Sequence, residues 1–203
     1  MTGSPPRPGP STRSAPEPRH AVIQFPGAMR ASFRWAGSGQ AAAVFALSEV
    51  GGELTDHGSL VSPDPDRLCR AEVRVETPAG AWTARLASTI FDDPVGAFWD
   101  EHGLLLVAYG FTTYAFAART GELRWSHRAK TPLVTLLLSS RLPHVLVQTE
   151  LETFAIRPDG EVAWRVAHSD VVVEAQLVGG RLGLASFGGQ TSSLDPLTGR
   201  SGR

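Results

Sequence analysis

The sequence predicts an all-β protein built from a repeated unit of four short strands. Short segments rich in β-branched and aromatic residues follow one another from Ala21 onward, and Gly, Pro and Asp separate them. The stretch "TYAFAARTGELRW" at 113–125 returns in related form as "TFAIRPDGEVAW" at 153–164. Amphipathic helices are scarce, and only the alanine-rich residues 40–49 compete with the strand assignment.

The repeat has a constant period. Two sets of residues recur at the same spacing along the chain, namely Gly121, Gly160 and Gly199, and Val95, Val134 and Val173. A repeat of about 40 residues that holds four short strands is typical of one blade of a β-propeller. The sequence therefore predicts a β-propeller-like array with three recognisable copies, the last incomplete, and a possible divergent blade before them.

The pattern within one copy assigns each strand a place in the blade. Residues 104–107 are all apolar, as expected of a strand covered on both faces, whereas residues 122–126 alternate, as expected nearer the rim. In the turn "RPDGE", Gly160 supplies the left-handed conformation of a bulged hairpin. Trp125 and Trp164, each four residues after a turn glycine, should lie mostly buried on the fourth strand.

The stretch "LLLVAYGFTTYAFAARTGELRW" resembles the repeat of quinoprotein-type (PQQ-like) β-propellers, and the resemblance extends over about residues 95–203. The third copy, "SSLDPLTGR", matches the motif only in part, because no tryptophan follows Gly199. The resemblance implies a propeller fold, and proteins with such repeats include quinone-dependent dehydrogenases, outer-membrane assembly lipoproteins and non-enzymatic binding scaffolds. The adjacent cysteine pair of the dehydrogenases cannot form because Cys69 is the single cysteine. We therefore assign no catalytic residue of that family to a position of this sequence, and we expect no cofactor.

The region before the clear repeats is less regular. Residues 1–19 are rich in proline and poor in large apolar residues, which predicts a disordered tail before a repeat domain at 20–203. Within that domain, 91–203 holds the clear repeats, and 20–90 is either a divergent blade or a β subdomain. Residues 71–88, with Gly80 at a turn and Trp82 beyond it, would supply its last two strands. Residues 30–35 and 41–48 would supply the first two.

Charge and composition exclude several classes of partner. The 19 Lys and Arg residues nearly balance the 20 Asp and Glu residues and are scattered, which predicts neither a nucleic-acid nor a membrane partner. The single cysteine, the lack of a signal-peptide pattern and the lack of a membrane-spanning apolar run favour a cytoplasmic protein.

Two loop segments hold residues that could bind a ligand. "GSGQAA" at 37–42 matches a dinucleotide-binding pattern, but no acidic residue follows at the end of a second parallel strand. A Pro-rich loop contains enough donors for a metal without a diagnostic spacing, namely Asp56, His57, Asp64, Asp66 and Cys69. A solvated turn is the simpler interpretation of both, and no metal site is expected.

Further titratable residues flank the clear repeats. An acid and a base could come from Asp92, Asp93, Asp100, Glu101 and His102. The other candidates, His127, His144 and His168, have no Ser or Cys partner at a recognisable spacing. Loop and rim positions explain all of them without catalysis.

The sequence thus favours a non-catalytic scaffold that binds an unidentified protein partner. The alternative is an enzyme or a small-ligand-binding propeller that uses the axial loops around Asp92, Asp93, His102 and Glu150. We also expect the incomplete last blade to be completed in one of two ways. Either the segment "HAVIQFPG" at 20–27 pairs with it and closes the array, or a second copy pairs there and forms a homodimer.

Overall fold

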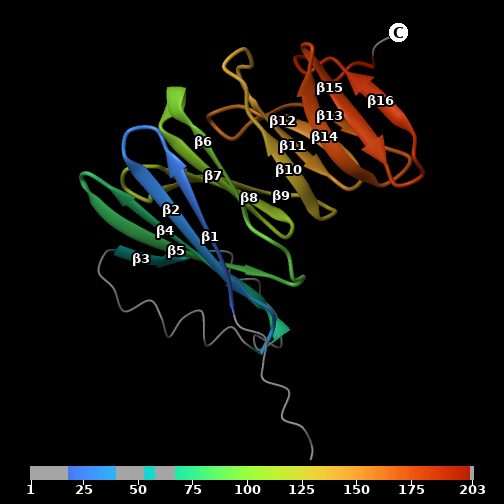
Figure 1. The fold of residues 1–203 in the computed structure, drawn as a ribbon. Coiled ribbons are helices and arrows are strands. Elements are labelled where there is room, and N and C mark those ends of the chain that lie inside the picture. Colours follow the sequence, from blue (N-terminus) through green and yellow to red (C-terminus); the bar gives the residue numbers. More distant parts are fainter. Residues whose placement is uncertain (1–17, 40–52, 58–66, 202–203) are drawn as a thin grey trace, which may run out of the picture.

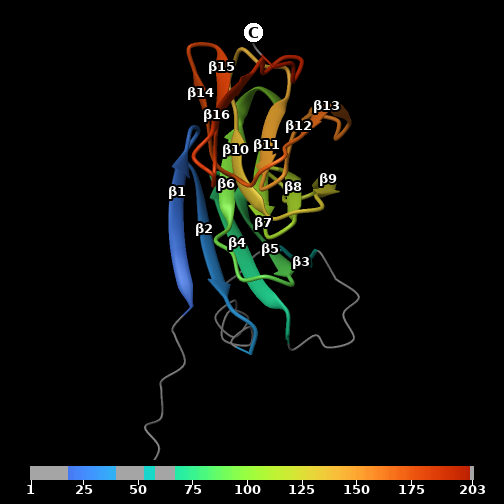
Figure 2. The same cartoon turned by 90° about the vertical axis from the view of Figure 1, so that its right-hand side faces the viewer.

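The structure, a computed structural model, describes residues 18–39, 53–57 and 67–201. The described residues form four β-sheets that follow one another along the chain and lie side by side in one row (Figure 1). From the side of the fourth sheet, the sheets are seen one behind another (Figure 2). Within these ranges no helix is long and apolar enough to cross a bilayer. The fold is all-β, and the sheets resemble propeller blades, as the repeat predicts.

Blades 2 and 3 are regular four-stranded antiparallel sheets. Blade 2 has the order β6-β7-β8-β9 and consists of β6 (Val95–Trp99), β7 (Leu104–Tyr109), β8 (Thr112–Ala117) and β9 (Leu123–Arg128). Blade 3 has the order β10-β11-β12-β13 and consists of β10 (Leu133–Leu137), β11 (Val145–Thr149), β12 (Glu152–Ile156) and β13 (Val162–Ala167). All residues of β7 and β11 are buried because both of their faces are covered by neighbouring sheets.

Blade 1 has five strands in the order β1-β2-β4-β5-β3. These are β1 (Arg19–Phe25), β2 (Met29–Ala36), β4 (Cys69–Thr77), β5 (Gly80–Ser88) and β3 (Glu53–Asp56), and the last pairs in parallel with β5. The expected strand order was wrong at the start, because β1 and not residues 30–35 comes first. Residues 41–48 lie outside the described ranges.

Blade 4 has three strands, β14 (Val172–Val178), β15 (Arg181–Ser186) and β16 (Thr191–Leu194). A single bridge between Leu194 and Ser201 marks the position where the fourth strand starts in blades 2 and 3. The expected closure by residues 20–27 was wrong, because β1 pairs along its whole length with β2 at the other end of the row (Figure 1). Pairing of a second copy at β16 stays a prediction.

The first strand of each blade lies on the same side of the row, and we call β1, β6, β10 and β14 the inner strands. The Phe25 ring on β1 contacts the Phe98 ring on β6 at a centroid distance of 5.7 Å, and β10 lies against both β6 and β14. The inner strands define two ends of the array. The entry end is where they begin, and the exit end is where they finish.

One contact recurs where neighbouring blades meet, and we call it the tryptophan joint. A tryptophan on β5, β9 or β13, the fourth strand in the order of its sheet, lies against the turn glycine of the next blade. A Cβ added to Gly121, Gly160 or Gly199 would come within 2.8 Å of Trp82, Trp125 or Trp164, respectively. Trp82 is 3% exposed, whereas Trp125 and Trp164 are half-buried. Each turn glycine has a positive φ, which L side chains rarely adopt. The repeat glycines therefore serve both the turn and the joint.

Candidate functional site

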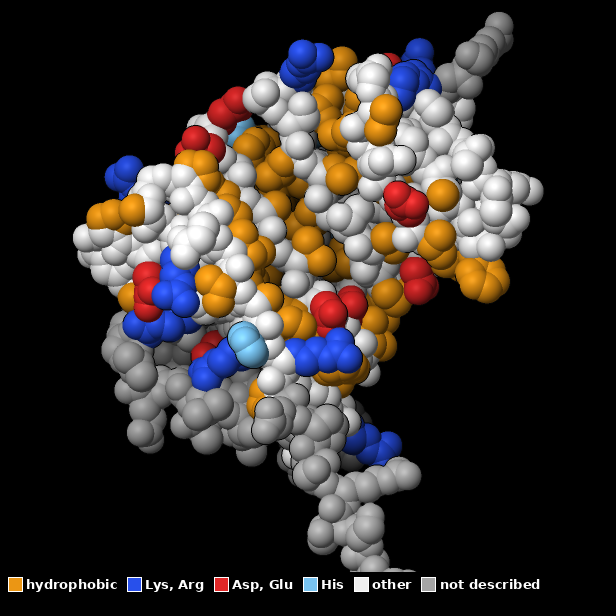
Figure 3. Space-filling view, in the orientation of Figure 1, with side chains coloured by type: hydrophobic (Ala, Val, Ile, Leu, Met, Phe, Trp, Pro, Cys, Tyr) orange, Lys and Arg blue, Asp and Glu red, His pale blue; other side chains and the backbone are white. Residues whose placement is uncertain are grey.

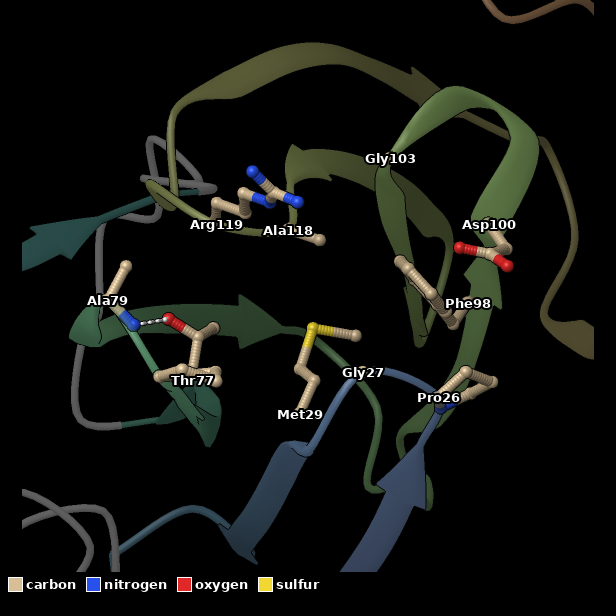
Figure 4. A pocket seen from close by; sticks show the side chains of 11 residues that line it. Pro26, Gly27, Met29, Thr77, Ala79, Phe98, Asp100, Gly103, Ala118 and Arg119 are labelled. Atoms are coloured by element: carbon tan, nitrogen blue, oxygen red, sulfur yellow. Dashed lines mark hydrogen bonds between the residues drawn. The ribbon is translucent and has the colours of Figure 1, made fainter.

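A cavity lies between blades 1 and 2 at the exit end, and we call it the exit cavity (Figure 4). Its volume is about 610 Å³, within the range of small-molecule pockets. Hairpin turns from both blades form it, and it is lined by Pro26, Gly27, Met29, Thr77, Pro78, Ala79, Phe98, Asp100, Gly103, Ala118 and Arg119. Small residues at the turns leave the space open, and Met29 and Phe98 give it an apolar interior.

Two charged residues stand at the exit cavity. Asp100 belongs to the 3-10 helix η2 (Asp100–His102), and Arg119 belongs to the turn between β8 and β9 (Figure 4). Both residues are exposed, and neither forms an ion pair with another described residue. Among the residues that line this site, the sequence analysis singled out Asp100, while the turn dipeptides Pro26-Gly27 and Ala79-Gly80 mark the blade 1 side of the cavity.

The structure does not bring the axial residues of the alternative hypothesis into one site. Asp92 and Asp93 precede β6 and lie at the entry end, where Glu150 also lies in the turn between β11 and β12. Asp100, Glu101 and His102 follow β6 and lie at the exit end. The five residues of β6 separate the two groups, by about 15 Å at the usual rise per residue of a strand.

Asp92 and Asp93 both make contacts that stabilise the fold. Asp93 accepts hydrogen bonds from the Trp35 indole at 2.8 Å and from Arg19 at 2.9 Å. Burial raises the pKa of the Asp92 carboxyl, and the nearby Asp93 and Glu150 carboxylates raise it further, against the opposing backbone N–H groups of Asp93 and Gly110. Asp92 therefore links the loop before blade 2 to the β7–β8 turn.

The same link recurs one repeat apart. Thr131 and Asp170 occupy the positions equivalent to Asp92 in the next two copies of the repeat. The Thr131 hydroxyl accepts a bond from the Leu151 N–H at 3.3 Å, and the Asp170 carboxylate accepts one from the Gly188 N–H at 3.0 Å. A hydroxyl replaces the carboxylate in the middle copy, so the position requires an acceptor and not a titratable acid.

The three histidines of the repeats lie in different contacts. His127 lies between blades 2 and 3, with its ring 4.9 Å from that of Phe154 and its Nε2 3.0 Å from Arg165. His168 bonds the buried Thr153 hydroxyl at 2.6 Å. His144 is buried, and its Nε2 donates to the Pro196 carbonyl at 2.8 Å. The structure therefore gives each a neighbour within the array.

The metal and nucleotide candidates fall largely outside the described ranges. Asp64 and Asp66, and residues 40–42 of the glycine-rich pattern, are not among the described residues. Cys69 is buried on β4. Within the ranges that the structure covers, no three His, Cys, Asp or Glu side chains group closely enough to hold a metal ion.

The inner strands carry a second candidate surface, the inner-strand face. Val22 on β1 is 47% exposed, and Val173 and Val178 on β14 are 51% and 60% exposed. Between them, β6 ("VGAFW") and β10 ("LVTLL") contain no charged residue, and most of their side chains are half-buried. Figure 3 shows hydrophobic side chains gathered over the middle of the molecule, around the second and third blades.

Comparisons with known proteins identify similar folds without identifying a family. No protein-family model matches the sequence, and no curated protein matches it. Solved structures of similar arrangement include BamB from Moraxella catarrhalis, with a TM-score of 0.49 and 20% identity over 64% of this chain and 41% of that one. The structure of HIRA residues 644–1017 has a TM-score of 0.47 and 14% identity over 90% of this chain and 51% of that one. The Neurospora crassa Pan2 WD40 domain has a TM-score of 0.46 and 19% identity over 67% of this chain and 45% of that one.

The chain spans about half the length of these structures, 41% to 51% in the three cases. Its own geometry supplies the fold assignment, through the blade-by-blade strand pairing and the recurring joints. Val95 begins β6, while Val134 and Val173 are the second residues of their strands, so the repeat valines lie on inner strands. The described chain therefore has a β-propeller-type fold.

Proposed function

We propose that this protein is a propeller-type interaction module that binds another protein through its inner-strand face. The observation that carries the proposal is the extent of this face, since partly exposed apolar residues occur on the inner strand of every blade. Val22 lies on β1, Ala97 on β6, Val134 on β10 and Val173 on β14. A small ligand would cover only part of such a row, whereas a protein segment could contact all of it.

The charge distribution supports the same choice. The outer strand β9 places the exposed residues Arg124, Ser126 and Arg128 toward solvent, while β6 and β10 are uncharged. Interface cores of protein complexes are depleted in charged residues. The middle of the inner-strand face, at β6 and β10, therefore has the composition of an interface core, whereas exposed charged residues occur on the inner strands at its two ends, Arg19 on β1 and Glu174 on β14.

Site-specific photo-crosslinking in the source cells tests the proposal. A benzoyl-phenylalanine placed at Thr135 on β10 should yield a discrete protein adduct, because this half-buried position lies on the inner-strand face. The matched control is the same group at Ser126, an exposed position on the outer strand β9. If both positions give the same adducts, or Thr135 gives none, the inner-strand face does not bind a protein.

A further inference from the structure

We propose that the exit cavity binds an extended peptide segment of a partner protein through one large apolar side chain between two charged residues of opposite sign. The apolar side chain would occupy the space beside Met29 and Phe98, an acidic residue of the segment would pair with Arg119, and a basic residue would pair with Asp100. The proposal rests on the proposed interaction function, and it adds a separate site with its own ligand chemistry.

The interior of the exit cavity suits an apolar side chain of variable shape. Met29 is only 4% exposed and belongs to the core shared by blades 1 and 2, and Phe98 packs against the same core. Methionine adapts to different apolar partners because its side chain is unbranched and polarisable. The walls at Gly27, Ala79, Gly103 and Ala118 bear at most a methyl group, so a side chain can enter between the turns.

The charges favour a segment that carries both signs. In Figure 4 the Asp100 carboxylate and the Arg119 guanidinium stand on either side of the cavity, with Phe98 and Met29 between them. Neither charge forms an ion pair within the described ranges, so each keeps its capacity for one. A purely anionic ligand would meet Asp100 and a purely cationic one would meet Arg119, whereas a peptide can offer one residue of each sign.

The backbone of one wall is strained. Ala28, in the turn between β1 and β2, has a φ of 57° and is the one non-glycine residue with positive φ among those the structure describes. Its neighbours Gly27 and Met29 both line the exit cavity. Strained turns that persist in folded proteins cluster at binding sites, where they fix the geometry of a wall in advance.

Selection from a random peptide library on the purified full chain tests the proposal. Enriched peptides should contain one Met, Leu, Phe or Trp with an acidic and a basic residue on its two sides. Synthetic copies should bind the Ala79→Trp variant at least about tenfold more weakly, because the indole fills the mouth of the cavity. The matched control, Ala167→Trp on the exposed outer strand β13, should bind like the wild type.

Charge reversal separates the apolar from the ionic part of the site. Arg119→Glu should weaken the selected peptides about tenfold, and exchange of their acidic residue for Lys should restore binding. Equal binding to wild type and Ala79→Trp, the lack of any enriched peptide, or failure of the charge exchange would overturn the proposal. Photo-crosslinking at Thr135 stays informative in that case, because the inner-strand face and the exit cavity are different surfaces.

Discussion

The first two tryptophan joints differ from the third in one hydrogen bond. The Trp82 indole donates to the Ala118 carbonyl and the Trp125 indole to the Pro158 carbonyl, each at 2.9 Å. Each carbonyl lies two residues beyond the last residue of the third strand that pairs with the fourth, namely Phe116 in blade 2 and Ile156 in blade 3. By the same count from Leu194, the equivalent carbonyl in blade 4 belongs to Pro196. In the third joint, the Pro196 carbonyl accepts its bond from His144 instead.

The third joint therefore keeps the contact but loses the polar link. Trp164 still lies against Gly199, yet its buried indole N–H has no hydrogen-bond partner among the residues that the structure describes. The His144 ring meets the Trp164 ring edge-on at 6.0 Å. A buried N–H without an acceptor lowers stability, because its desolvation is not offset. The comparison shows that the glycine contact and the tryptophan hydrogen bond are separable features of the joint.

Truncation of Trp82 should produce the largest loss. Its indole is 3% exposed and belongs to the core between blades 1 and 2, so Trp82→Ala should reduce the free energy of unfolding by about 3–5 kcal/mol. Trp125→Ala should cost less because Trp125 is half-buried. Urea unfolding measures both variants. If Trp125→Ala proves the more harmful substitution, the burial of the two joints does not determine their strength.

A methyl group at the joint glycine tests the close contact itself. Gly160→Ala should cost about 2–4 kcal/mol, because its φ of +94° strains an alanine and the new Cβ would lie 2.8 Å from Trp125 Cγ. Gly189 is a matched control with a φ of +78° and no atom near the added Cβ. Gly189→Ala should cost only about 1 kcal/mol, from backbone strain alone. Equal losses in urea unfolding would show that Trp125 yields to the methyl group.

Acid should weaken the region around blade 3 through two histidines. Burial lowers the pKa of His127 below its ordinary value, Arg165 lowers it further, and burial also lowers the pKa of His168. The unfolded chain therefore binds protons at a higher pH than the folded chain, and stability falls as the pH drops through about 6.5 toward the lower folded pKa values.

Thermal melts between pH 7.5 and pH 5.5 measure this effect. The melting temperature of the His127→Gln/His168→Gln variant should fall by less between pH 7.5 and pH 5.5 than that of the wild type. Carboxylates that titrate at lower pH contribute little in this window. A variant with the same pH dependence as the wild type would assign the acid sensitivity to other groups.

The blade pattern could be predicted from the sequence because it depends on interactions between residues that are near one another in the chain. Turn glycines at a constant period and apolar strands such as Leu104–Val107 follow from backbone and burial requirements within one blade. The first blade departs from the expected strand order, since the Pro26-Gly27 turn joins β1 to β2 in a hairpin. β1 therefore belongs to blade 1 and does not pair with the last blade.

Contacts between blades could not be predicted in the same way. The partner of each joint tryptophan belongs to the following blade, far along the chain, and neither the Pro158 nor the Pro196 carbonyl leaves a signature in residue type. The exit cavity likewise arises from four turns whose proximity depends on how blades 1 and 2 pack. The expected grouping of Asp92 with His102 failed because the length of an intervening strand places them at opposite ends.

Paired Trp→Phe substitutions test the tryptophan joint most directly. Trp125→Phe keeps an aromatic ring but removes the donor to the Pro158 carbonyl, and it should lower the free energy of unfolding by about 1–2 kcal/mol more than Trp164→Phe does. Trp164→Phe removes an N–H that has no partner in the described part of the chain, so it should cost little beyond the lost ring area. Equal losses in urea unfolding, or a larger loss for Trp164→Phe, would contradict the assignment of the two joints.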